Sequence, residues 1–296
     1  MKISFIGGLG FIGKRAVRNL IKNNHEVTVL DIRKPETQKN DFKFIHQDVR
    51  DFNSLVDNLK KEKPEAVYDL AGTTLNEEGQ NPRYSVGLDV WGLSNVFEAC
   101  TQLNINKILY SSSFYVYQGI SPSETVDETR RSSPFLASLL GSSKIAGERV
   151  VQSYTQDNDI SYVVFRFGSA YGFDSRCTAV PYFLFKEGLE TGKITIWGKG
   201  DRMNQYTFVE DIAAGVARSV ELENEVINLI GPERTSMKQL AEIFQKEFNF
   251  EPIFLTDKKE GPSFPSMSSD KAKKLIDWKT TSVADGLRKT YQQFKG

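Results

Sequence analysis

Short apolar runs alternate with amphipathic stripes from the start of the chain to about residue 172. The run at 3–6 is typical of a strand buried in a parallel sheet, and the stripe at 17–21 has helical spacing. An alternating chain of this kind forms an open parallel sheet covered by helices, so we expect an α/β fold. The same pattern predicts further strands at 27–30, 42–46, 66–70, 107–110 and 162–166, and helices at 52–61, 82–103 and 141–156.

The regular alternation ends at about residue 173. We interpret the chain as a sheet domain made of residues 1–172 and 206–230, and a smaller α/β lobe made of residues 173–205 and 231–296. After the change, the pattern predicts helices at 182–191, 209–220, 236–247, 268–276 and 282–294, and short strands at 194–196, 226–230 and near 253.

Glycines at 7, 10 and 13 lie between the first strand and the first helix. Gly7 allows a tight turn, Gly10 lets the backbone approach a pyrophosphate, and Gly13 lets the helix pack closely on the sheet. The helix N-terminus offers free N–H groups to the phosphates. Asp31 follows the second strand, where it can accept both hydroxyls of an adenosine ribose. We predict a Rossmann-type doubly wound sheet that binds NAD; Arg33 keeps NADP as the less favoured alternative.

Composition narrows the remaining classes of function. Lys plus Arg and Asp plus Glu are both 38 in 296 residues, so the net charge is zero and binding to nucleic acid is not expected. No run of about eighteen apolar residues predicts a membrane span. Cys100 and Cys177 are the only cysteines and lack metal-ligand spacing. We therefore expect no metal site and a reduced, cytoplasmic protein.

A series of short stretches follows the glycines and Asp31 in order: His46-Gln47-Asp48-Val49, Asp69-Leu70-Ala71-Gly72, Asp89-Val90-Trp91-Gly92-Leu93-Ser94-Asn95, Ser111-Ser112-Ser113, Gly141-Ser142-Ser143-Lys144, Arg166, Tyr171-Gly172, Gly198-Lys199-Gly200, Val209-Glu210-Asp211 and Asp277-Trp278. This ordered set resembles the extended short-chain dehydrogenase/reductase family, in particular its NAD-dependent nucleotide-sugar epimerases and dehydratases. The resemblance covers nearly the whole chain.

The resemblance implies a Tyr-x-x-x-Lys pair, in which the tyrosine takes a proton from a substrate hydroxyl while hydride moves to NAD. Ser113 and Lys144 match the family's serine and lysine, but Leu140 stands at the tyrosine position and cannot transfer a proton. We therefore expect altered acid/base residues. Tyr115 is the candidate for a displaced proton donor, and Lys144 would lower its pKa if the two were close. The alternative is that Tyr115 only packs against the substrate or the sheet.

The resemblance also implies contacts to the two ligands. Asn204 stands where the family has an arginine that holds the nucleotide diphosphate, and Arg202 is the candidate to replace it. For Cys177 the alternative to a substrate contact is an uncharged structural thiol. The expected cofactor contacts are Gly7, Gly10, Phe11, Ile12, Gly13, Asp31, Asp48, Val49, Leu70, Ala71, Gly72 and Lys144, and the expected substrate contacts are Ser169, Cys177, Arg202 and Asn204.

Two functions follow from these expectations. The first is an enzyme that oxidises and reduces a nucleotide-activated sugar or related polyol by transient hydride transfer. The second, motivated by Leu140 and Asn204, is a catalytically inactive or non-redox NAD-binding protein with a regulatory or structural role. The resemblance further implies a homodimer through the helices at 82–103 and 141–156.

Overall fold

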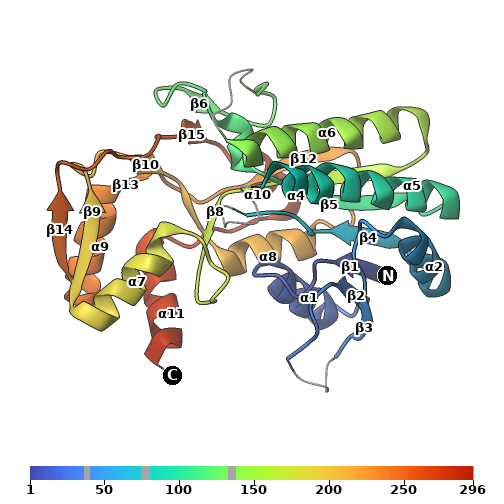
Figure 1. Cartoon of the computed structure of the whole chain (residues 1–296), viewed down its shortest axis with the longest axis horizontal. Coiled ribbons are helices and arrows are strands. Elements are labelled where there is room, and N and C mark those ends of the chain that lie inside the picture. Colours follow the sequence, from blue (N-terminus) through green and yellow to red (C-terminus); the bar gives the residue numbers. More distant parts are fainter. Residues whose placement is uncertain (37–40, 75–80, 133–137, 296) are drawn as a thin grey trace.

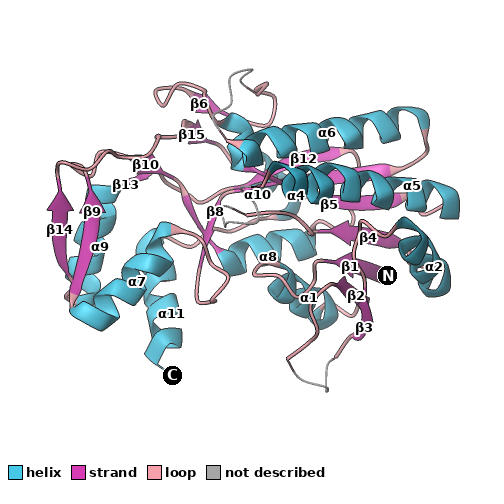
Figure 2. Ribbon diagram, viewed as in Figure 1, coloured by secondary structure: helices cyan, strands magenta, loops and turns pink. Residues whose placement is uncertain are grey.

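The chain forms a central parallel sheet flanked by helices (Figures 1 and 2). This computed structural model describes residues 1–36, 41–74, 81–132 and 138–295. The sheet order is β12-β7-β5-β4-β1-β2-β3. From β1 the chain adds β2 and β3 on one side and then β4, β5, β7 and β12 on the other side, as in a doubly wound sheet. The predicted Rossmann-type α/β fold is confirmed. The strands are β1 Lys2–Ile6, β2 Glu26–Asp31, β3 Lys43–His46, β4 Ala66–Asp69, β5 Lys107–Ser113, β7 Ser161–Phe167 and β12 Glu225–Leu229.

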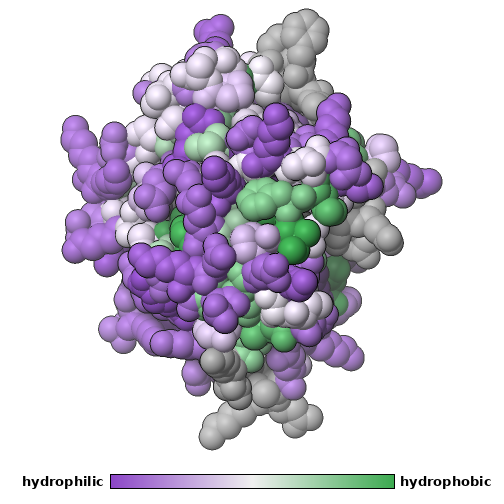
Figure 3. Space-filling view, turned by 90° about the vertical axis from the view of Figure 1, so that its left-hand side faces the viewer, coloured by the Kyte–Doolittle hydropathy of each residue, from purple (hydrophilic) through white to green (hydrophobic). Residues whose placement is uncertain are grey.

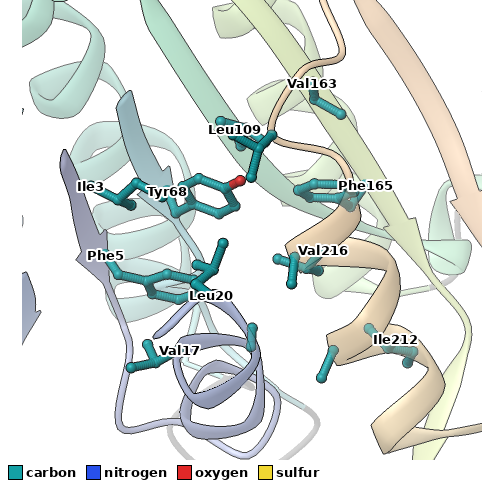
Figure 4. Close-up of a cluster of buried hydrophobic side chains, with 14 of the residues drawn as sticks. Ile3, Phe5, Val17, Leu20, Tyr68, Leu109, Val163, Phe165, Ile212 and Val216 are labelled. Atoms are coloured by element: carbon teal, nitrogen blue, oxygen red, sulfur yellow. The ribbon is translucent and has the colours of Figure 1, made fainter. Parts of the chain in front are cut away.

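Two apolar clusters hold helices against the two faces of this sheet. On one face, Val17 and Leu20 of α1 and Val216 of α8 meet strand residues such as Phe5 and Tyr68 (Figure 4). The other face is covered by α2, α5 and α6, whose apolar residues form the second cluster. The helices span α1 Gly13–Lys22, α8 Val209–Arg218, α10 Asp270–Ile276, α2 Phe52–Glu62, α5 Leu93–Leu103 and α6 Leu139–Asp157.

The predicted helix at 82–103 is present but is not uniform. It begins as α4 (Pro82–Val86), continues as a π-helical segment, η1 (Gly87–Gly92), and ends as α5. A π-helical turn accommodates extra backbone within a helix and often occurs at functional sites. Asp89 lies inside this segment and is buried. Leu93, Phe97 and Cys100 are buried, whereas Val86 is 47% exposed.

A smaller lobe lies at the end of the molecule away from β3 and α2 (Figure 1). Its core is a cluster of buried side chains that includes many aromatic rings. Its parallel strands β9 (Lys193–Trp197) and β14 (Glu251–Leu255) pair with each other. α10 packs against β12 of the main sheet and against the neighbouring helix α8. The residue boundaries of the two units stay a prediction. The lobe's helices are α7 Val180–Thr191, α9 Met237–Phe248 and α11 Val283–Lys295.

Short elements connect the two units. The ladders pair β8 with β11, β10 with β13 and β6 with β15. None of the helices in the described ranges is long and apolar enough to cross a membrane. The connecting elements are η2 Phe114–Tyr117, β6 Thr125–Val126, β8 Ser169–Tyr171, β10 Met203–Asn204, β11 Tyr206–Phe208, β13 Thr235–Ser236 and β15 Ser266–Met267.

Candidate functional site

The turn after β1 forms the base of a cofactor cradle. Gly7 has a φ of +74°, and a Cβ atom there would lie 2.7 Å from the Ala71 amide nitrogen, so a side chain does not fit. A Cβ atom on Gly13 would overlap the Gly7 carbonyl, so glycine lets α1 begin close to the turn. No side chain of the described residues caps the start of α1, where the Lys14 amide donates to the Gly10 carbonyl and the Arg15 amide to the Ile12 carbonyl, so a phosphate here would meet the positive end of the helix dipole.

Asp31 is fixed at the end of β2 by the glycine turn. Its Oδ2 accepts a hydrogen bond from the Leu9 amide at 2.9 Å, and its Oδ1 accepts one from the Arg33 amide at 2.9 Å. The carboxylate borders a cavity of about 130 Å³. Glycines of the turn and a carboxylate both line this cavity, and these are the groups that contact the diphosphate and the ribose of a dinucleotide in such folds. Eight predicted cofactor residues line it: Gly7, Gly10, Asp31, Asp48, Val49, Leu70, Ala71 and Gly72.

Polar and aromatic side chains close the far end of this cavity. Arg50 forms an ion pair with Asp48, and its guanidinium lies 5.4 Å from the centre of the Tyr84 ring. Hydrogen bonds from Arg50 lower the pKa of Asp48. The other four predicted cofactor residues, Phe11, Ile12, Gly13 and Lys144, lie outside the lining. Phe11 packs against the aromatic cluster of the smaller lobe, and Ile12 packs against the sheet cluster.

Lys144 lies behind the cavity wall and is 4% exposed. Its Nζ donates to the Ser111 carbonyl at 3.1 Å and lies 3.1 Å from Oδ1 of Asp89. Burial disfavours the charged ammonium, but Asp89, with smaller effects of Tyr110 and Asp69, outweighs burial, and the pKa of Lys144 is raised. Gly72 lies against this pair, because a Cβ atom there would be 2.8 Å from Nζ. Burial also raises the pKa of the neighbouring Asp69 to about 7.

Ser113 and Tyr115 lie together where β5 ends. The Ser113 hydroxyl accepts a hydrogen bond from the Tyr115 amide at 3.3 Å. The Tyr115 ring centre lies 5.2 Å from that of Phe264. Burial raises the pKa of Tyr115, and the charge that counteracts burial is that of Arg202. The effect of Lys144 on Tyr115 stays a prediction.

The smaller lobe contains a second pocket of about 390 Å³. Arg202 lines it, and the buried Nε of Arg202 has no hydrogen-bond partner within the described ranges. Trp197 and Phe183 are 60% and 53% exposed and supply apolar walls. Figure 3 shows this side of the molecule, where apolar side chains are scattered among hydrophilic ones. The pocket therefore combines an unsatisfied cationic donor with flat aromatic surface.

Glu260 fixes the turn that carries Arg202. Its carboxylate accepts hydrogen bonds from the amides of Lys199, Gly200 and Asp201 at 2.8, 2.9 and 3.2 Å, and from that of Arg202. Successive backbone amides in such a turn form a binding site for an anion. This carboxylate occupies that site from within the chain and holds the turn in one conformation.

Three predicted substrate residues do not line this pocket. Asn204 is 5% exposed and its Oδ1 accepts a hydrogen bond from the Gln205 amide at 2.8 Å. Cys177 is 2% exposed and belongs to the apolar cluster of the smaller lobe. Burial raises the pKa of the Cys177 thiol, which agrees with a structural role. Ser169 lies half-buried at the start of β8.

A single family model matches most of the chain. The model of the NAD dependent epimerase/dehydratase family matches residues 3–229. This chain belongs to that family. The epimerase/dehydratase-family enzyme uses NAD, as predicted from the glycine turn and Asp31.

Two relatives of this epimerase/dehydratase-family enzyme match along nearly their full length. A putative UDP-glucose 4-epimerase of Methanocaldococcus jannaschii is 26% identical over 299 residues, covering 98% of this chain and 97% of the relative. A UDP-glucuronate 4-epimerase of Thermodesulfobacterium geofontis is 28% identical over 309 residues, covering 96% and 93%. These relatives agree with the resemblance read from the motifs.

Solved structures show the same fold. A UDP-glucuronic acid 4-epimerase from Bacillus cereus, in complex with UDP-glucuronic acid and NAD, has a TM-score of 0.86 and 25% identity, covering 100% of this chain and 99% of that chain. A UDP-glucose 4-epimerase with UDP-glucose from Thermotoga maritima has a TM-score of 0.90 at 24% identity and the same coverage.

The partner of Lys144 in this family member was not predicted as a site residue. The resemblance marks Asp89 as a departure at the site, because the family has an asparagine there, but its pairing with Lys144 was not predicted. One signal for it was present, because Ser85 and Asp89 are four residues apart on a predicted helix and their side chains are hydrogen-bonded at 3.3 Å. The role of Glu260 had no local signal, since its bonds reach a turn far along the chain.

Proposed function

We propose that the enzyme acts on a nucleotide-activated sugar or a related polyol through transient hydride transfer, with acid/base residues that differ from the family pattern. One observation carries the proposal: Lys144, Gly141 and Tyr115 lie between the NAD cavity and the charge of Arg202, which lines the pocket of the smaller lobe. Gly72 lies against Lys144 on α6, and a Cβ atom on Gly141, at the start of that helix, would lie 2.9 Å from the Tyr115 carbonyl. The charge of Arg202 in turn acts on Tyr115.

The names of the relatives support the substrate class. They include epimerases of UDP-glucose, UDP-glucuronate and GDP-mannose. Arg202 suits a diphosphate, because a guanidinium forms strong paired hydrogen bonds with phosphate oxygens. Trp197 suits a nucleobase, because an exposed aromatic face can stack on another ring.

We assign the remaining roles to residues around the cleft. NAD, when bound, supplies the acceptor and donor of the hydride. Asp31 orients the adenosine ribose, and Ser113 orients the reacting hydroxyl of the substrate. Tyr115 takes a proton from that hydroxyl and returns it, while Lys144 lies beside the cofactor cavity. Ser169, Cys177 and Asn204 remain predicted substrate contacts.

The test is hydride chemistry in the purified enzyme. NAD is added with UDP-glucose, UDP-glucuronic acid or GDP-mannose, near-ultraviolet absorbance reports reduced nicotinamide, and NMR identifies epimeric products. We expect Tyr115→Phe to lower the rate by roughly 10²–10⁴-fold. Tyr154→Phe is the matched control, because the Tyr154 hydroxyl bonds Glu98 at 3.3 Å away from the cleft. Full activity in Tyr115→Phe would exclude Tyr115 as the proton donor.

A second candidate is a non-redox NAD-binding protein with a regulatory or structural role. The observation that favours it is the environment of Lys144: Leu140 supplies no ionisable group one turn away, and Asp89 already pairs with the ammonium. Reduction of bound NAD by any nucleotide sugar would contradict this candidate.

We also propose a homodimer formed through α5 and α6, which pack side by side. Trp91, just before α5, is 64% exposed, and a large exposed aromatic ring suits a contact with a second copy of the chain. A cytoplasmic location is proposed from Cys100 and Cys177, which are both buried free thiols and suit a reducing compartment.

A further inference from the structure

Lys144 and Asp89 form an ion pair that is removed from water. They are 4% and 1% exposed, and Nζ lies 3.1 Å from Oδ1. Lys144 makes one further hydrogen bond, to the Ser111 carbonyl. A charge pair buried in this way is held in place, because separating the partners would leave an uncompensated charge in a medium of low polarity.

The Asp89 carboxylate is saturated by donors from three segments. The Thr73 amide donates to Oδ1 at 3.0 Å, and the Ser143 hydroxyl donates to Oδ2 at 3.0 Å. The hydroxyls of Thr73 and Ser85 also donate to Oδ2. Burial opposes ionisation of Asp89, but Lys144 and these hydrogen bonds outweigh burial and lower its pKa. Asp89 is therefore a fixed anion.

The neighbouring position on α6 has no ionisable group. Leu140 precedes Lys144 by one helical turn, so the two side chains share a face of the helix, and Leu140 is 8% exposed. The negative charge beside Lys144 comes from η1 instead. A cation that already has an anion at contact distance exerts a much weaker field on any third group, because the two charges largely cancel.

We propose that Asp89 is a positioning residue that neutralises Lys144, so that Lys144 stays fixed beside the cofactor cavity but cannot lower the pKa of a hydroxyl or thiol placed at position 140. The inference rests on the proposed function, because it concerns how Lys144 serves that reaction. As a consequence, the residues at positions 89 and 140 depend on each other. A phenol or thiol introduced at position 140 would keep an ordinary or raised pKa while Asp89 is present.

The test compares Leu140→Tyr with the double variant Leu140→Tyr/Asp89→Asn. ¹³C labelling at Cζ of tyrosine lets NMR resolve the introduced phenol from the eleven native tyrosines. In the single variant we expect a phenol pKa at or above its ordinary value. In the double variant we expect a pKa lower by about one unit or more, since the introduced phenolate then replaces Asp89 as the anion that pairs with the Lys144 ammonium. Equal pKa values in the two variants would overturn the inference.

A smaller side chain gives the same test where tyrosine is not accommodated. Leu140→Cys is compared with Leu140→Cys/Asp89→Asn, and the pH profile of alkylation by iodoacetamide gives the thiol pKa. Cys100 and Cys177 are both buried and provide the slow background. We expect the profile to move to lower pH when Asp89 is replaced. An unchanged profile would contradict the role of Asp89.

Asparagine is the matched replacement for Asp89, because its carbonyl oxygen can still accept hydrogen bonds from Thr73 and Ser143. Thermal unfolding of each variant confirms that the site is folded. The titrations do not depend on turnover. A lowered pKa in the double variants therefore supports the inference even if no nucleotide sugar reacts with any variant, and that outcome would count against the proposed function alone.

Discussion

Two buried tyrosine hydroxyls differ in their hydrogen bonds. The Tyr68 hydroxyl lies in the apolar cluster against α1 and α8 (Figure 4) and has no partner among the described residues. The Tyr117 hydroxyl donates to Oδ1 of Asn228 at 2.9 Å and accepts from Nη1 of Arg166 at 2.8 Å. A buried hydroxyl without a partner keeps its full cost of desolvation, whereas hydrogen bonds offset that cost.

These two tyrosines should respond in opposite directions to loss of the hydroxyl. We expect Tyr68→Phe to raise the free energy of unfolding by about 1 kcal/mol, and Tyr117→Phe to lower it by about 1–2 kcal/mol. Urea unfolding of both variants beside the wild type measures the difference. A loss of stability in Tyr68→Phe would show that its hydroxyl has a partner.

Asp69 should contribute to the pH dependence of stability. Burial raises its pKa from 3.8 to about 7. Between about pH 4 and pH 7 the folded chain therefore holds more protons at this site than the unfolded chain, so the stability from this group falls as the pH rises. Asp69→Asn removes that fall, while its carbonyl can still accept the Ala71 amide.

We expect Asp69→Asn to gain stability relative to the wild type as the pH rises through this window, and to show no such gain near pH 4. Unfolding curves collected at several pH values, with the wild type as reference, test this. A stability difference that is the same at every pH would mean that Asp69 has an ordinary pKa.

The sequence predicts those site residues whose role depends on neighbours along the chain. Gly7, Gly13 and Asp31 are recognisable because one strand–turn–helix–strand unit contains all three. Asp89 bonds Ser85 on its own helix, but its bond with Ser143 joins groups distant in sequence, as does the bond of Glu260 with the Lys199 amide. No local spacing encodes such a contact, since it exists only once separate elements have packed together.

At the scale of elements, strands and helices longer than about one turn were predicted well, because each repeats its apolar residues often enough to define a period. The π-helical segment Gly87–Gly92 was not predicted. Apolar spacing shows that a stretch is helical, but six residues are too few to separate one hydrogen-bond register from another. Two-residue strands such as Thr125–Val126 have no period at all.

Two exposed tryptophans allow the proposed dimer surface and the proposed substrate pocket to be tested separately. Trp91 lies beside α5 and is 64% exposed, whereas Trp197 ends β9 and is 60% exposed. We expect Trp91→Ser to shift the protein from dimer to monomer in sedimentation, because loss of a large aromatic contact weakens an interface by about 2 kcal/mol or more. We expect Trp197→Ser to raise the KM for a nucleotide sugar about tenfold or more.

Each tryptophan variant is the control for the other. Trp197→Ser should sediment like the wild type, and Trp91→Ser should keep its affinity for NAD. A monomeric wild type would contradict the proposed dimer. An unchanged KM in Trp197→Ser would show that the nucleobase binds elsewhere.

At the scale of the whole molecule, the loop after β8 ties the smaller lobe to the glycine turn. Asp174 is 6% exposed and pairs with Lys14 of α1 at 2.5 Å and with Arg176 at 2.8 Å. Arg176 also donates to the Leu9 carbonyl. The lobe is built from separate segments of the chain, so its assembly depends on contacts that the pattern of apolar residues does not contain.

NAD should stabilise the whole chain, because only the folded state has the cradle. At an NAD concentration one hundred times Kd, the expected gain is about 2.7 kcal/mol, visible as a rise in the unfolding temperature. NADP should give a smaller rise, since Asp31 repels a ribose phosphate, and Asp31→Asn should narrow the gap. Equal shifts with the two nucleotides in the wild type would contradict the preference for NAD.

Because of the π-helical segment, the number of residues in this helix decides which side chains face Lys144. Successive residues of an α-helix are about 100° apart around the axis, and a π turn absorbs surplus backbone within it. Deleting one residue between Gly87 and Gly92 would leave a helix. A deletion before Asp89 would turn Ser85 by about 100° relative to Asp89, and a deletion after it would turn Asp89 by about 100° relative to α5. Single-residue insertions and deletions here therefore leave the fold in place and exchange the groups that surround Lys144.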